Sequence, residues 1–439
     1  MSPFLLRPSY PNGRRKQLKL VVIGNGIAGN TAAQTVRRLD RDAEITLVSD
    51  QSYSFYTACA LPHYLAGDLS RRGLFVKTRK TYEKERIRLI AGRKVLSIST
   101  DRKTIDLENG AIEYDRLIVA SGSRPLVPPI EGVKLPGVHT FKYLDDAAEI
   151  KASAPKTAVV VGTGPIGIEA GIALNKRGVK VYMIELMTRI MPRIFDDAPA
   201  LMLRGILQDH GIEILTGERV MRIAGTDKVE GIVTDKRTIT CDLIVMAAGM
   251  RPNSELAKEA GIGVAQRGGI VVDHRMATSA PDVYACGDCV EAADLITGAP
   301  GMIQLWHNAK EQGEVAGSNA AGAARTFAGS INITSLDVFN SHAVSFGNIH
   351  ADLAQQQGIE VIEKPHDGQG YHRLVMKGGQ IVGAQFIGNV TDMGAVLFAL
   401  IRKDKLAELK EFGPGRPTIA TLLRDYRLSP FLRAKPIQR

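Results

Sequence analysis

Two stretches of the chain share one hydrophobic pattern, in which an apolar strand runs into a glycine-rich turn and then into a helix. The first is LKLVVIGNGIAGNTAAQTVRRL (18–39), and the second is TAVVVGTGPIGIEAGIALNKRG (157–178). Each is followed by another apolar strand, AEITLVSD and VKVYMIEL. Strand, helix and strand at this spacing predict the start of a βαβ unit with parallel strands in both places.

Both turns carry the spacing G-x-G-x-x-G. In such a turn the first glycine makes the bend, the second lets backbone N–H groups approach a pyrophosphate, and the third lets the helix pack closely on the strand. Two copies in this setting predict two dinucleotide sites. Their turn residues are Gly24, Gly26, Ala28 and Gly29 in the first copy, and Gly162, Gly164, Pro165 and Ile166 in the second.

An acidic residue at the end of the next strand is expected to bind a ribose hydroxyl. In the second copy this residue is Glu185, whose negative charge favours NAD(H) over NADP(H) because it would repel a 2′-phosphate. In the first copy the acid is Asp50, which lies one place later than the pattern requires.

Length and composition indicate a globular protein of two or three domains, since 439 residues exceed what one hydrophobic core supports. No apolar run approaches the roughly 18 residues of a membrane helix, and the start of the chain lacks the apolar stretch of a secretory signal. Four scattered cysteines fit a reducing compartment and are too few for a disulfide framework or an iron–sulfur cluster of the protein's own. We therefore expect a cytoplasmic protein with no membrane insertion and no metal site.

The net charge of +10 raises the question of a polyanionic partner. The basic clusters are short, and no aromatic residues interleave them as stacking platforms for single-stranded nucleic acid. We therefore expect a solvated basic surface that attracts an acidic protein, and no nucleic acid. The clusters are Arg14-Arg15-Lys16, Arg71-Arg72, Lys77 to Lys80 and Arg402-Lys403.

A third motif identifies a family. In TSAPDVYACGDCVE (278–291), a threonine precedes the strand Val283-Tyr284-Ala285 and then Gly287-Asp288. The chain here resembles the FAD-dependent pyridine nucleotide-disulfide oxidoreductase superfamily, in which this aspartate binds the ribitol chain of FAD. YDRLIVASGSRP (114–125) and DLIVMAAGMRPNSEL (242–256) resemble the crossovers between its FAD and NAD domains. The residues that these two segments add to the predicted cofactor sites are Ser121, Gly122, Arg124 and Gly249.

The resemblance implies an α/β fold with two Rossmann-like dinucleotide-binding domains and a C-terminal α+β interface domain, through which these enzymes dimerise. The implied cofactors are FAD and NAD(H). The expected parts are a basic flexible tail at 1–17, an FAD domain at 18–125 and 253–325, an inserted NAD domain at 150–252, and the interface domain with its tail at 330–439.

The family also implies catalytic positions. Glu169, just after the second turn, matches the family's glutamate near the nicotinamide and the flavin. In the family this glutamate has a lysine as its partner. The only nearby candidates for that role in this chain are His63 and Lys77. The segment IQLWHNAKEQGEVAG (303–317), with Trp306 and His307 at its start, resembles the helix that points at the flavin ring.

Cys59, in SFYTACALPHY (54–64), leaves two alternatives open. Cys59-Ala60-Leu61-Pro62 resembles the single-cysteine branch of coenzyme A-disulfide reductases and NADH oxidases or peroxidases, in which the thiol is redox-active. That branch usually has glycine where Ala60 stands, and its oxidases and peroxidases have histidine where Ile27 stands. LPHYLAGDL also resembles thiol-independent reductases, in which the flavin passes electrons to a separate metal-containing protein. Cys286 and Cys289 lie inside the flavin motif, and we do not expect them to form a redox pair.

Three hypotheses follow. The first is a flavoprotein that transfers hydride between NAD(H) and FAD and exchanges electrons with an acidic iron–sulfur carrier or a partner subunit. The second is a Cys59-dependent reductase of coenzyme A disulfide or persulfide, or an NADH oxidase or peroxidase. The third is a redox-sensing or interaction protein that keeps the fold but turns over slowly. Under each, the chain forms a homodimer or belongs to a larger complex.

Overall fold

The structure is a computed structural model, and it describes residues 17–349, 358–364 and 370–403. The chain divides into two compact units, each assembled from three stretches of sequence. The first unit contains the glycine turn at Gly24, and the second contains the turn at Gly162. The stretches are Met1–Pro128, Thr140–Ala154 and Ala248–Ile331 in the first unit, and Pro129–His139, Pro155–Ala247 and Asn332–Arg439 in the second.

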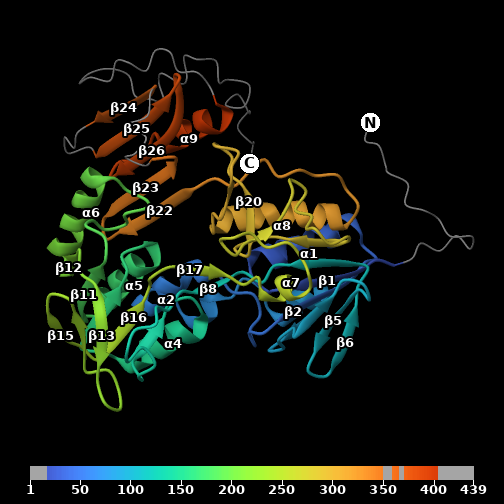
Figure 1. Ribbon diagram of the computed structural model, residues 1–439, viewed down its shortest axis with the longest axis horizontal. Helices are drawn as coiled ribbons and strands as arrows, with labels where there is room; N and C mark the ends of the chain where they lie inside the picture. The colour runs from blue at the N-terminus through green and yellow to red at the C-terminus, as the bar shows by residue number, and fades with distance from the viewer. Residues whose placement is uncertain (1–16, 350–357, 365–369, 404–439) are drawn as a thin grey trace, which may run out of the picture. The chain divides into compact units, whose positions relative to one another are not determined.

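A five-stranded sheet forms the centre of the first unit (Figure 1). Its strand order is β19-β7-β1-β2-β3, and each neighbouring pair is parallel. Four of the five residues of the central strand KLVVI are buried, as expected in the interior of a parallel sheet. The strands are β1 (Lys19–Ile23), β2 (Glu44–Ser49), β3 (Ile87–Ala91), β7 (Arg116–Val119) and β19 (Val283–Ala285).

Two helices of this unit, α1 (Ile27–Leu39) and α8 (Trp306–Ala320), lie side by side (Figure 1). Their backbones are so close that a Cβ added at Gly313 would lie 2.4 Å from the carbonyl oxygen of Ala28. A Cβ added at Gly317 would lie 2.5 Å from the carbonyl oxygen of Ala32. Because α1 begins at the first glycine turn, this close packing also holds the turn in place.

Shorter elements complete the first unit. β4, β5 and β6 form an antiparallel sheet, and β8 pairs antiparallel with β17. These elements are η1 (Ala58–Ala60), α2 (Leu61–Ala66), η2 (Arg71–Leu74), α3 (Arg79–Lys84), β4 (Ser97–Ser99), β5 (Thr104–Leu107), β6 (Gly110–Glu113), β8 (Ser123–Pro125), α4 (Leu144–Ser153), β17 (Met250–Pro252), α7 (Glu255–Glu259), β18 (Ile270–Val271), β20 (Val290–Ala293) and β21 (Pro300–Gly301).

The second unit repeats the strand, turn and helix plan. Its sheet has the order β12-β11-β10-β16-β9, and β10 pairs in parallel with both β11 and β16. The antiparallel strands β13, β14 and β15 form a second, smaller sheet. The elements are β9 (Val138–Thr140), β10 (Thr157–Val161), α5 (Pro165–Lys176), β11 (Lys180–Glu185), α6 (Asp197–Asp209), β12 (Glu213–Thr216), β13 (Val220–Ala224), β14 (Gly231–Thr234), β15 (Thr238–Thr240) and β16 (Leu243–Met246).

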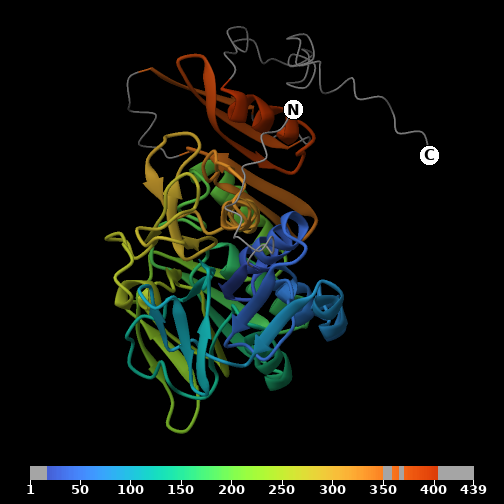
Figure 2. The ribbon, with the colours of Figure 1, turned by 90° about the vertical axis from the view of Figure 1, so that its right-hand side faces the viewer.

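A C-terminal antiparallel sheet belongs to the second unit and has the order β22-β23-β26-β25-β24. The helix α9 packs on β26 and β23 (Figure 2). Side chains of this sheet hold the loop before α6, because Ser345 and Gln385 both donate hydrogen bonds to the carbonyl oxygen of Ile194, at 2.7 and 3.2 Å. The elements are β22 (Ile333–Val338), β23 (Ser341–Gly347), β24 (Ile359–Lys364), β25 (Tyr371–Lys377), β26 (Gln380–Ile387) and α9 (Met393–Arg402).

The fold class predicted from the sequence is confirmed: two parallel Rossmann-like sheets and a C-terminal antiparallel sheet with a helix. The domain boundaries stay predictions. Residues 1–16 of the expected basic tail and the chain after residue 403 lie outside the described residues. Within the described part, no helix is long and apolar enough to cross a membrane, and no group of three or more His, Cys, Asp or Glu side chains is placed to hold a metal ion.

Candidate cofactor-binding and redox site

The first glycine turn needs its glycines for different reasons. Gly24 has φ +113°, and a Cβ there would lie 2.0 Å from the carbonyl oxygen of Ala120 on the neighbouring segment. A Cβ at Gly29 would lie 2.0 Å from the carbonyl oxygen of Gly24. A Cβ at Gly26 would meet no atom within 4 Å, and the backbone of Gly26 has an ordinary φ of −79°. The fold itself therefore requires Gly24 and Gly29, whereas Gly26 leaves open space of the kind that a closely approaching ligand needs.

The second turn repeats this arrangement in the other unit. Gly162 has φ +103°, and a Cβ at Gly167 would lie 2.1 Å from the carbonyl oxygen of Gly162. A Cβ at Gly164 would meet nothing within 4 Å. Pro165 and Ile166 form the first turn of α5, where the missing N–H of proline costs no hydrogen bond. Both turns thus fit a dinucleotide pyrophosphate at the start of a helix.

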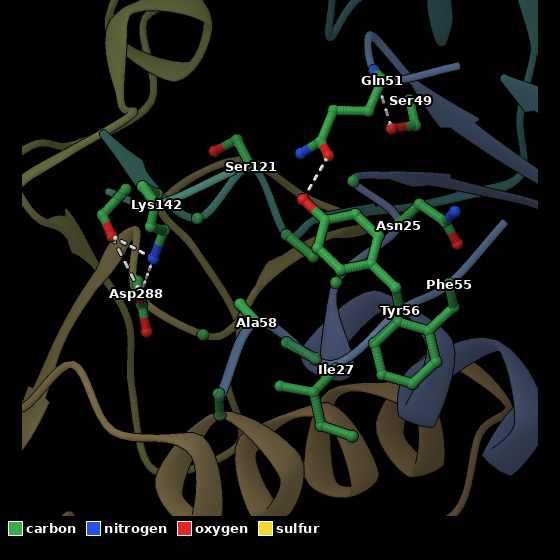
Figure 3. A pocket seen from close by; sticks show the side chains of 18 of the residues that line it. Asn25, Ile27, Ser49, Gln51, Phe55, Tyr56, Ala58, Ser121, Lys142 and Asp288 are labelled. Atoms are coloured by element: carbon green, nitrogen blue, oxygen red, sulfur yellow. Dashed lines mark hydrogen bonds and ion pairs between the residues drawn. The ribbon is translucent and has the colours of Figure 1, made fainter. Parts of the chain in front are cut away.

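A cavity of about 300 Å³ lies within the first unit, and it gathers segments that are far apart in the sequence (Figure 3). Its wall includes eight of the residues predicted to bind FAD, together with Cys59. These eight are Gly24, Gly26, Ala28, Asp50, Ser121, Gly122, Gly287 and Asp288.

Three other predicted cofactor residues do not line this cavity. Gly29 is buried under the turn. Arg124 is paired with Glu255 at 2.6 Å and donates a hydrogen bond to Asn253 at 2.8 Å. Gly249 has φ +126°, and its carbonyl oxygen accepts a hydrogen bond from the N–H of Leu126. Arg124 and Gly249 therefore belong to the paired crossover segments that flank the cavity.

Asp288 is held by two polar side chains in the cavity wall. Its Oδ2 accepts a hydrogen bond from Ser123 Oγ at 2.8 Å and lies 3.3 Å from Lys142 Nζ (Figure 3). The backbone around it is fixed as well, because Gln312 accepts a hydrogen bond from the N–H of Gly287 and Gln304 donates one to the carbonyl oxygen of Asp288. A carboxylate held in this way is well placed to bind hydroxyl groups of a ribitol chain.

Lys142 was not predicted from the sequence. It lies in FKYLDD (141–146), between the segments assigned to the FAD and NAD domains, and this stretch has no motif. Only the return of residues 140–154 to the first unit brings Lys142 to Asp288.

Tyrosines form another part of the wall. Tyr56 donates a hydrogen bond to Gln51 at 2.7 Å and accepts one from the N–H of Leu144 at 3.1 Å (Figure 3). Burial raises the pKa of Tyr56 to about 12, so it stays protonated. Tyr53 donates to Asp145 at 2.5 Å. These bonds join the loop after β2 to the start of α4.

A partly buried polar network joins the glycine turn to the same loop. Asn25 donates a hydrogen bond to the carbonyl oxygen of Tyr53 at 3.0 Å. The side-chain oxygen of Asn25 lies 2.7 Å from the hydroxyl of Tyr82 and accepts a hydrogen bond from Asn30 at 2.8 Å. Buried polar groups that satisfy one another in this way hold one conformation.

Asp50, the predicted ribose-binding acid of the first copy, follows the end of β2 by one residue, as the sequence pattern indicates. The strand β2 ends at Ser49, which occupies the place that Glu185 has at the end of β11. The hydrogen bonds of the two glycine turns show that these positions are equivalent. The N–H of Gly24 donates to the carbonyl oxygen of Val48, and the N–H of Gly162 donates to the carbonyl oxygen of Ile184, each at 2.8 Å. Asp50 lies one residue beyond the strand, and both Ser49 and Asp50 line the cavity.

Cys59 lies in the short turn η1, immediately before α2, and its side chain is exposed in the cavity wall. The other three cysteines are buried, and none of the four is in a disulfide. Burial raises the pKa of the Cys241 thiol to about 12, and it also raises the pKa values of Cys286 and Cys289. These three thiols are therefore poor nucleophiles.

The start of α8 also reaches the cavity. Trp306 is 46% exposed and lines the wall together with Gln304. His307 is not part of the wall, and its Nε2 lies 3.0 Å from the carbonyl oxygen of Ile331.

In the second unit, Glu185 is tied to the glycine turn. Its carboxylate accepts hydrogen bonds from the backbone N–H and the hydroxyl of Thr163 at 3.0 and 2.7 Å, and from the N–H of Met187 at 2.9 Å. Leu186 and Met187, which follow it, are exposed apolar residues. No basic side chain therefore stands next to Glu185 in the sequence to receive a 2′-phosphate.

Glu169 lies half-buried on α5 in the second unit. Burial raises its pKa to about 7, and the negative charge of Asp337 on β22 adds to this effect. A carboxyl group with this pKa exchanges a proton near neutral pH.

The two candidates for a lysine partner of Glu169 have other contacts within the first unit. Lys77 is buried and pairs with Glu85 at 2.6 Å. His63 Nδ1 lies 3.8 Å from Asp68, and both side chains are exposed.

Comparison with known proteins shows the family. The family model described as pyridine nucleotide-disulphide oxidoreductase matches residues 18–313. An NADH oxidase of Methanocaldococcus jannaschii is 30% identical, with 90% of this chain and 94% of that protein covered. An NAD(P)H coenzyme A polysulfide/persulfide reductase of Pyrococcus horikoshii is 31% identical, with 86% and 89% covered. A nitrite reductase [NAD(P)H] of Bacillus subtilis is 32% identical over 88% of this chain, which spans about half, 47%, of that protein.

Solved structures agree with this result. An NAD-dependent persulfide reductase from A. fulgidus has a TM-score of 0.85 and 30% identity, with 93% of this chain and 83% of that chain covered. A ferredoxin reductase from Rhodopseudomonas palustris has a TM-score of 0.81 and 25% identity, with 90% and 97% covered. The chain belongs to the pyridine nucleotide-disulphide oxidoreductase family, whose members bind FAD and NAD(P)H, and it is an NAD(P)H-dependent flavoprotein oxidoreductase.

Proposed function

We propose that the protein is an electron-transfer flavoenzyme, which exchanges hydride with NAD(H) and electrons with a separate iron–sulfur protein or a partner subunit. The observation that carries this proposal is the cavity of the first unit, which brings the glycine turn, Ser121-Gly122 and Gly287-Asp288 together. FAD, when bound, takes a hydride from NADH and releases electrons singly, so one NADH and two oxidised one-electron carriers yield NAD⁺, a proton and two reduced carriers.

The residues of the cavity have distinct binding roles in this proposal. The backbone N–H groups at the start of α1 hold the pyrophosphate, and Gly26 leaves room for it. Asp288 binds ribitol hydroxyls, and Lys142 and Ser123 orient its carboxylate. Ser49 and Asp50 lie where the adenosine end is expected, after β2.

We propose NADH rather than NADPH as the coenzyme. The carboxylate of Glu185 at the end of β11 supports this choice, because it binds ribose hydroxyls and repels a 2′-phosphate. Glu169 is the fifth residue of α5, the helix that begins at this turn, and its pKa of about 7 lies close to neutral pH. The measurement is kcat/KM with each coenzyme, and a value higher for NADPH would contradict the proposal.

Two features favour a separate electron acceptor over thiol chemistry. Cys59 is the one cysteine among the cavity-lining residues, and the remaining three thiols are buried. No histidine lines the cavity in the described part of the chain to activate a thiol. Two relatives, a nitrite reductase and a ferredoxin reductase, have names consistent with delivery of electrons to metal centres.

The position of Cys59 supports a second candidate function. Its exposed side chain in the cavity wall fits a thiol that reacts beside the flavin, as in a coenzyme A-disulfide or persulfide reductase, or in an NADH oxidase or peroxidase. Relatives named NADH oxidase and coenzyme A polysulfide/persulfide reductase are consistent with this alternative.

Replacement of Cys59 tests one function against the other. In the Cys59→Ser variant, we expect NADH-dependent reduction of a one-electron iron carrier to stay within about two-fold of the wild type, because no step of the proposal uses the thiol. Ala58→Ser is the matched control, since it adds a hydroxyl to the same wall. If Cys59→Ser reduces the carrier about a hundred-fold or more slowly and Ala58→Ser does not, the protein is a Cys59-dependent enzyme instead.

We also propose that the enzyme works in the cytoplasm, as a homodimer or as a subunit of a larger complex. The relatives include an electron transfer subunit of an assimilatory nitrate reductase in Bacillus subtilis. The mass of the purified holoenzyme in solution, measured by light scattering, and the fractionation of cell extracts test these two points.

A further inference from the structure

One short stretch of the first unit carries much of the chain's positive charge. Residues 71–94 contain ten lysines and arginines against two glutamates, a net charge of +8, while the whole chain has +10. The stretch includes η2, α3 and β3. Nine of its ten basic side chains are exposed, and we call these nine the basic surface. They are Arg71, Arg72, Arg79, Lys80, Lys84, Arg86, Arg88, Arg93 and Lys94.

Most of this charge is not neutralised by the protein itself. In residues 17–349, 358–364 and 370–403, six side chains of the basic surface have no hydrogen bond or ion pair. Arg93 has a long ion pair to Glu108, at 3.4 Å, and Arg86 donates to the carbonyl oxygen of Arg41. The six are Arg72, Arg79, Lys80, Lys84, Arg88 and Lys94.

The chain between Arg72 and Arg79 of the basic surface is hydrogen-bonded to the wall of the cavity. The N–H of Thr57, two residues before Cys59, bonds the carbonyl oxygen of Leu74 at 3.0 Å. The N–H groups of Val76 and Lys77 bond the carbonyl oxygen of Phe55 at 3.0 and 3.1 Å. Phe55 and Thr57 both line the cavity, so residues 74–77 form the layer directly behind this wall.

The stretch also contains buried side chains that contact one another. The buried Lys77 is paired with Glu85 and lies 5.0 Å from the ring centroid of Tyr82, whose side chain is 2% exposed. At the outside, Val76 is 57% exposed between the two groups of basic residues. An exposed apolar residue that lies in the sequence between basic residues fits a protein–protein interface with an apolar centre and a polar rim.

On the basis of the proposed function, we infer that the basic surface is the docking site for a small acidic protein that carries the iron–sulfur centre. Charges of one sign beside the cavity steer an oppositely charged protein toward it and orient it there. A nucleic acid fits less well, because no aromatic side chain of residues 71–94 is exposed for a base to stack on.

Charge reversal tests the inference. The test variant carries Arg72→Glu, Arg79→Glu and Lys80→Glu, three exposed residues that the cofactor-binding cavity does not use. The matched control carries Arg222→Glu, Lys228→Glu and Lys236→Glu, three exposed residues of the second unit, and changes the net charge by the same amount. The probe is rubredoxin, a small acidic protein with one iron held by cysteines. Its binding to the FAD-loaded proteins is measured by calorimetry without NADH, and its reduction by NADH is measured separately.

The expected result is a Kd and a KM for rubredoxin about ten-fold or more higher in the test variant at low salt, with little change in the control. This difference should shrink at 0.5 M salt, because screening shortens the range of the charges. The rate with menadione, a neutral acceptor, should stay the same in all three proteins.

Other outcomes overturn the inference in distinguishable ways. If the wild type reduces rubredoxin and the test variant binds it as tightly as the wild type does, the carrier docks elsewhere. The proposed function then still holds. If the wild type neither binds nor reduces rubredoxin but reduces coenzyme A disulfide, the proposed function fails as well. If a duplex oligonucleotide binds the basic surface more tightly than rubredoxin does, the surface recognises nucleic acid.

Discussion

Individual glycines of the two turns separate the needs of the fold from the needs of a ligand. Gly24 and Gly162 have positive φ, and Gly29 and Gly167 have no room for a side chain. At Gly26 neither condition holds, since an added Cβ would meet nothing within 4 Å. The protein alone therefore gives no reason for glycine at this position, and a bound dinucleotide does.

Substitution by alanine tests this distinction. Gly26→Ala should leave the stability of the flavin-free protein within about 1 kcal/mol of the wild type, yet should lower the FAD content of the purified protein several-fold. Gly24→Ala should instead destabilise the fold by about 3 kcal/mol or more, because its Cβ would clash with Ala120. The measurements are urea unfolding and the ratio of FAD absorbance to protein.

The control is Gly205→Ala on α6, where an added Cβ also meets nothing within 4 Å. It should retain FAD fully. Normal FAD content in Gly26→Ala would show that no pyrophosphate approaches this turn.

Glu169 gives the protein a pH dependence of known sign. Its folded pKa of about 7 lies above the ordinary value of 4.5, so the folded state binds more protons between these two pH values. The free energy of unfolding therefore falls as the pH rises from 4.5 to 7, and the loss is complete above pH 7. Glu169→Gln removes this loss, and at pH 8 it should stabilise the protein by on the order of 1–3 kcal/mol.

Urea unfolding at pH 4.5 and pH 8 measures the effect. The two proteins should differ far less at pH 4.5, where Glu169 is largely protonated when folded. Glu230→Gln, an exposed glutamate of the same unit, is the control and should show no such pH-dependent gain. An equal difference at both pH values would mean that folding does not raise the pKa of Glu169.

Among the elements, the contact of α1 with α8 links packing to the cofactor cavity. Gly313 permits this contact, and α1 carries the glycine turn at its start. Gly313→Ala should destabilise the protein by about 1–3 kcal/mol and weaken FAD binding, because the two helices must separate. Gly394→Ala on α9 is the control, since a Cβ there meets nothing within 4 Å. Thermal unfolding measures the stability, and the Kd for FAD measures the binding. Lowered stability with unchanged FAD binding would show that the contact of α1 with α8 does not affect the cofactor site.

The elements that the sequence predicts best are those with a local signal. Both glycine turns lie where the apolar strand and helical pattern place them, because each turn is specified by residues within about ten positions. The sequence pattern already places Asp50 one residue too late, and the register agrees, because Val48 pairs with Ile23 as Ile184 pairs with Val161, so that Ser49 matches Glu185.

Other cavity residues have no local signal at all. Lys142, Tyr53 and Tyr56 reach the site through contacts across long sequence separations, such as the bond from Leu144 to Tyr56. A pattern within one stretch cannot report these contacts, because they depend on how residues 140–154 return to the first unit.

For the whole molecule, the division into two units predicts how cofactors act on stability. Each unit has its own parallel sheet and its own glycine turn, and the cavity is built from the first unit alone. A ligand that binds only the folded state adds about 2.7 kcal/mol at a hundred times its Kd, and it stabilises only the part that binds it.

Scanning calorimetry of the flavin-free protein should therefore show two transitions. FAD should raise the temperature of one transition, and NAD⁺ that of the other. Gly26→Ala should reduce the first shift and Gly164→Ala the second, because each substitution places a methyl group in one pyrophosphate site and weakens binding there. A single transition that both ligands raise together would show instead that the two units unfold as one cooperative body.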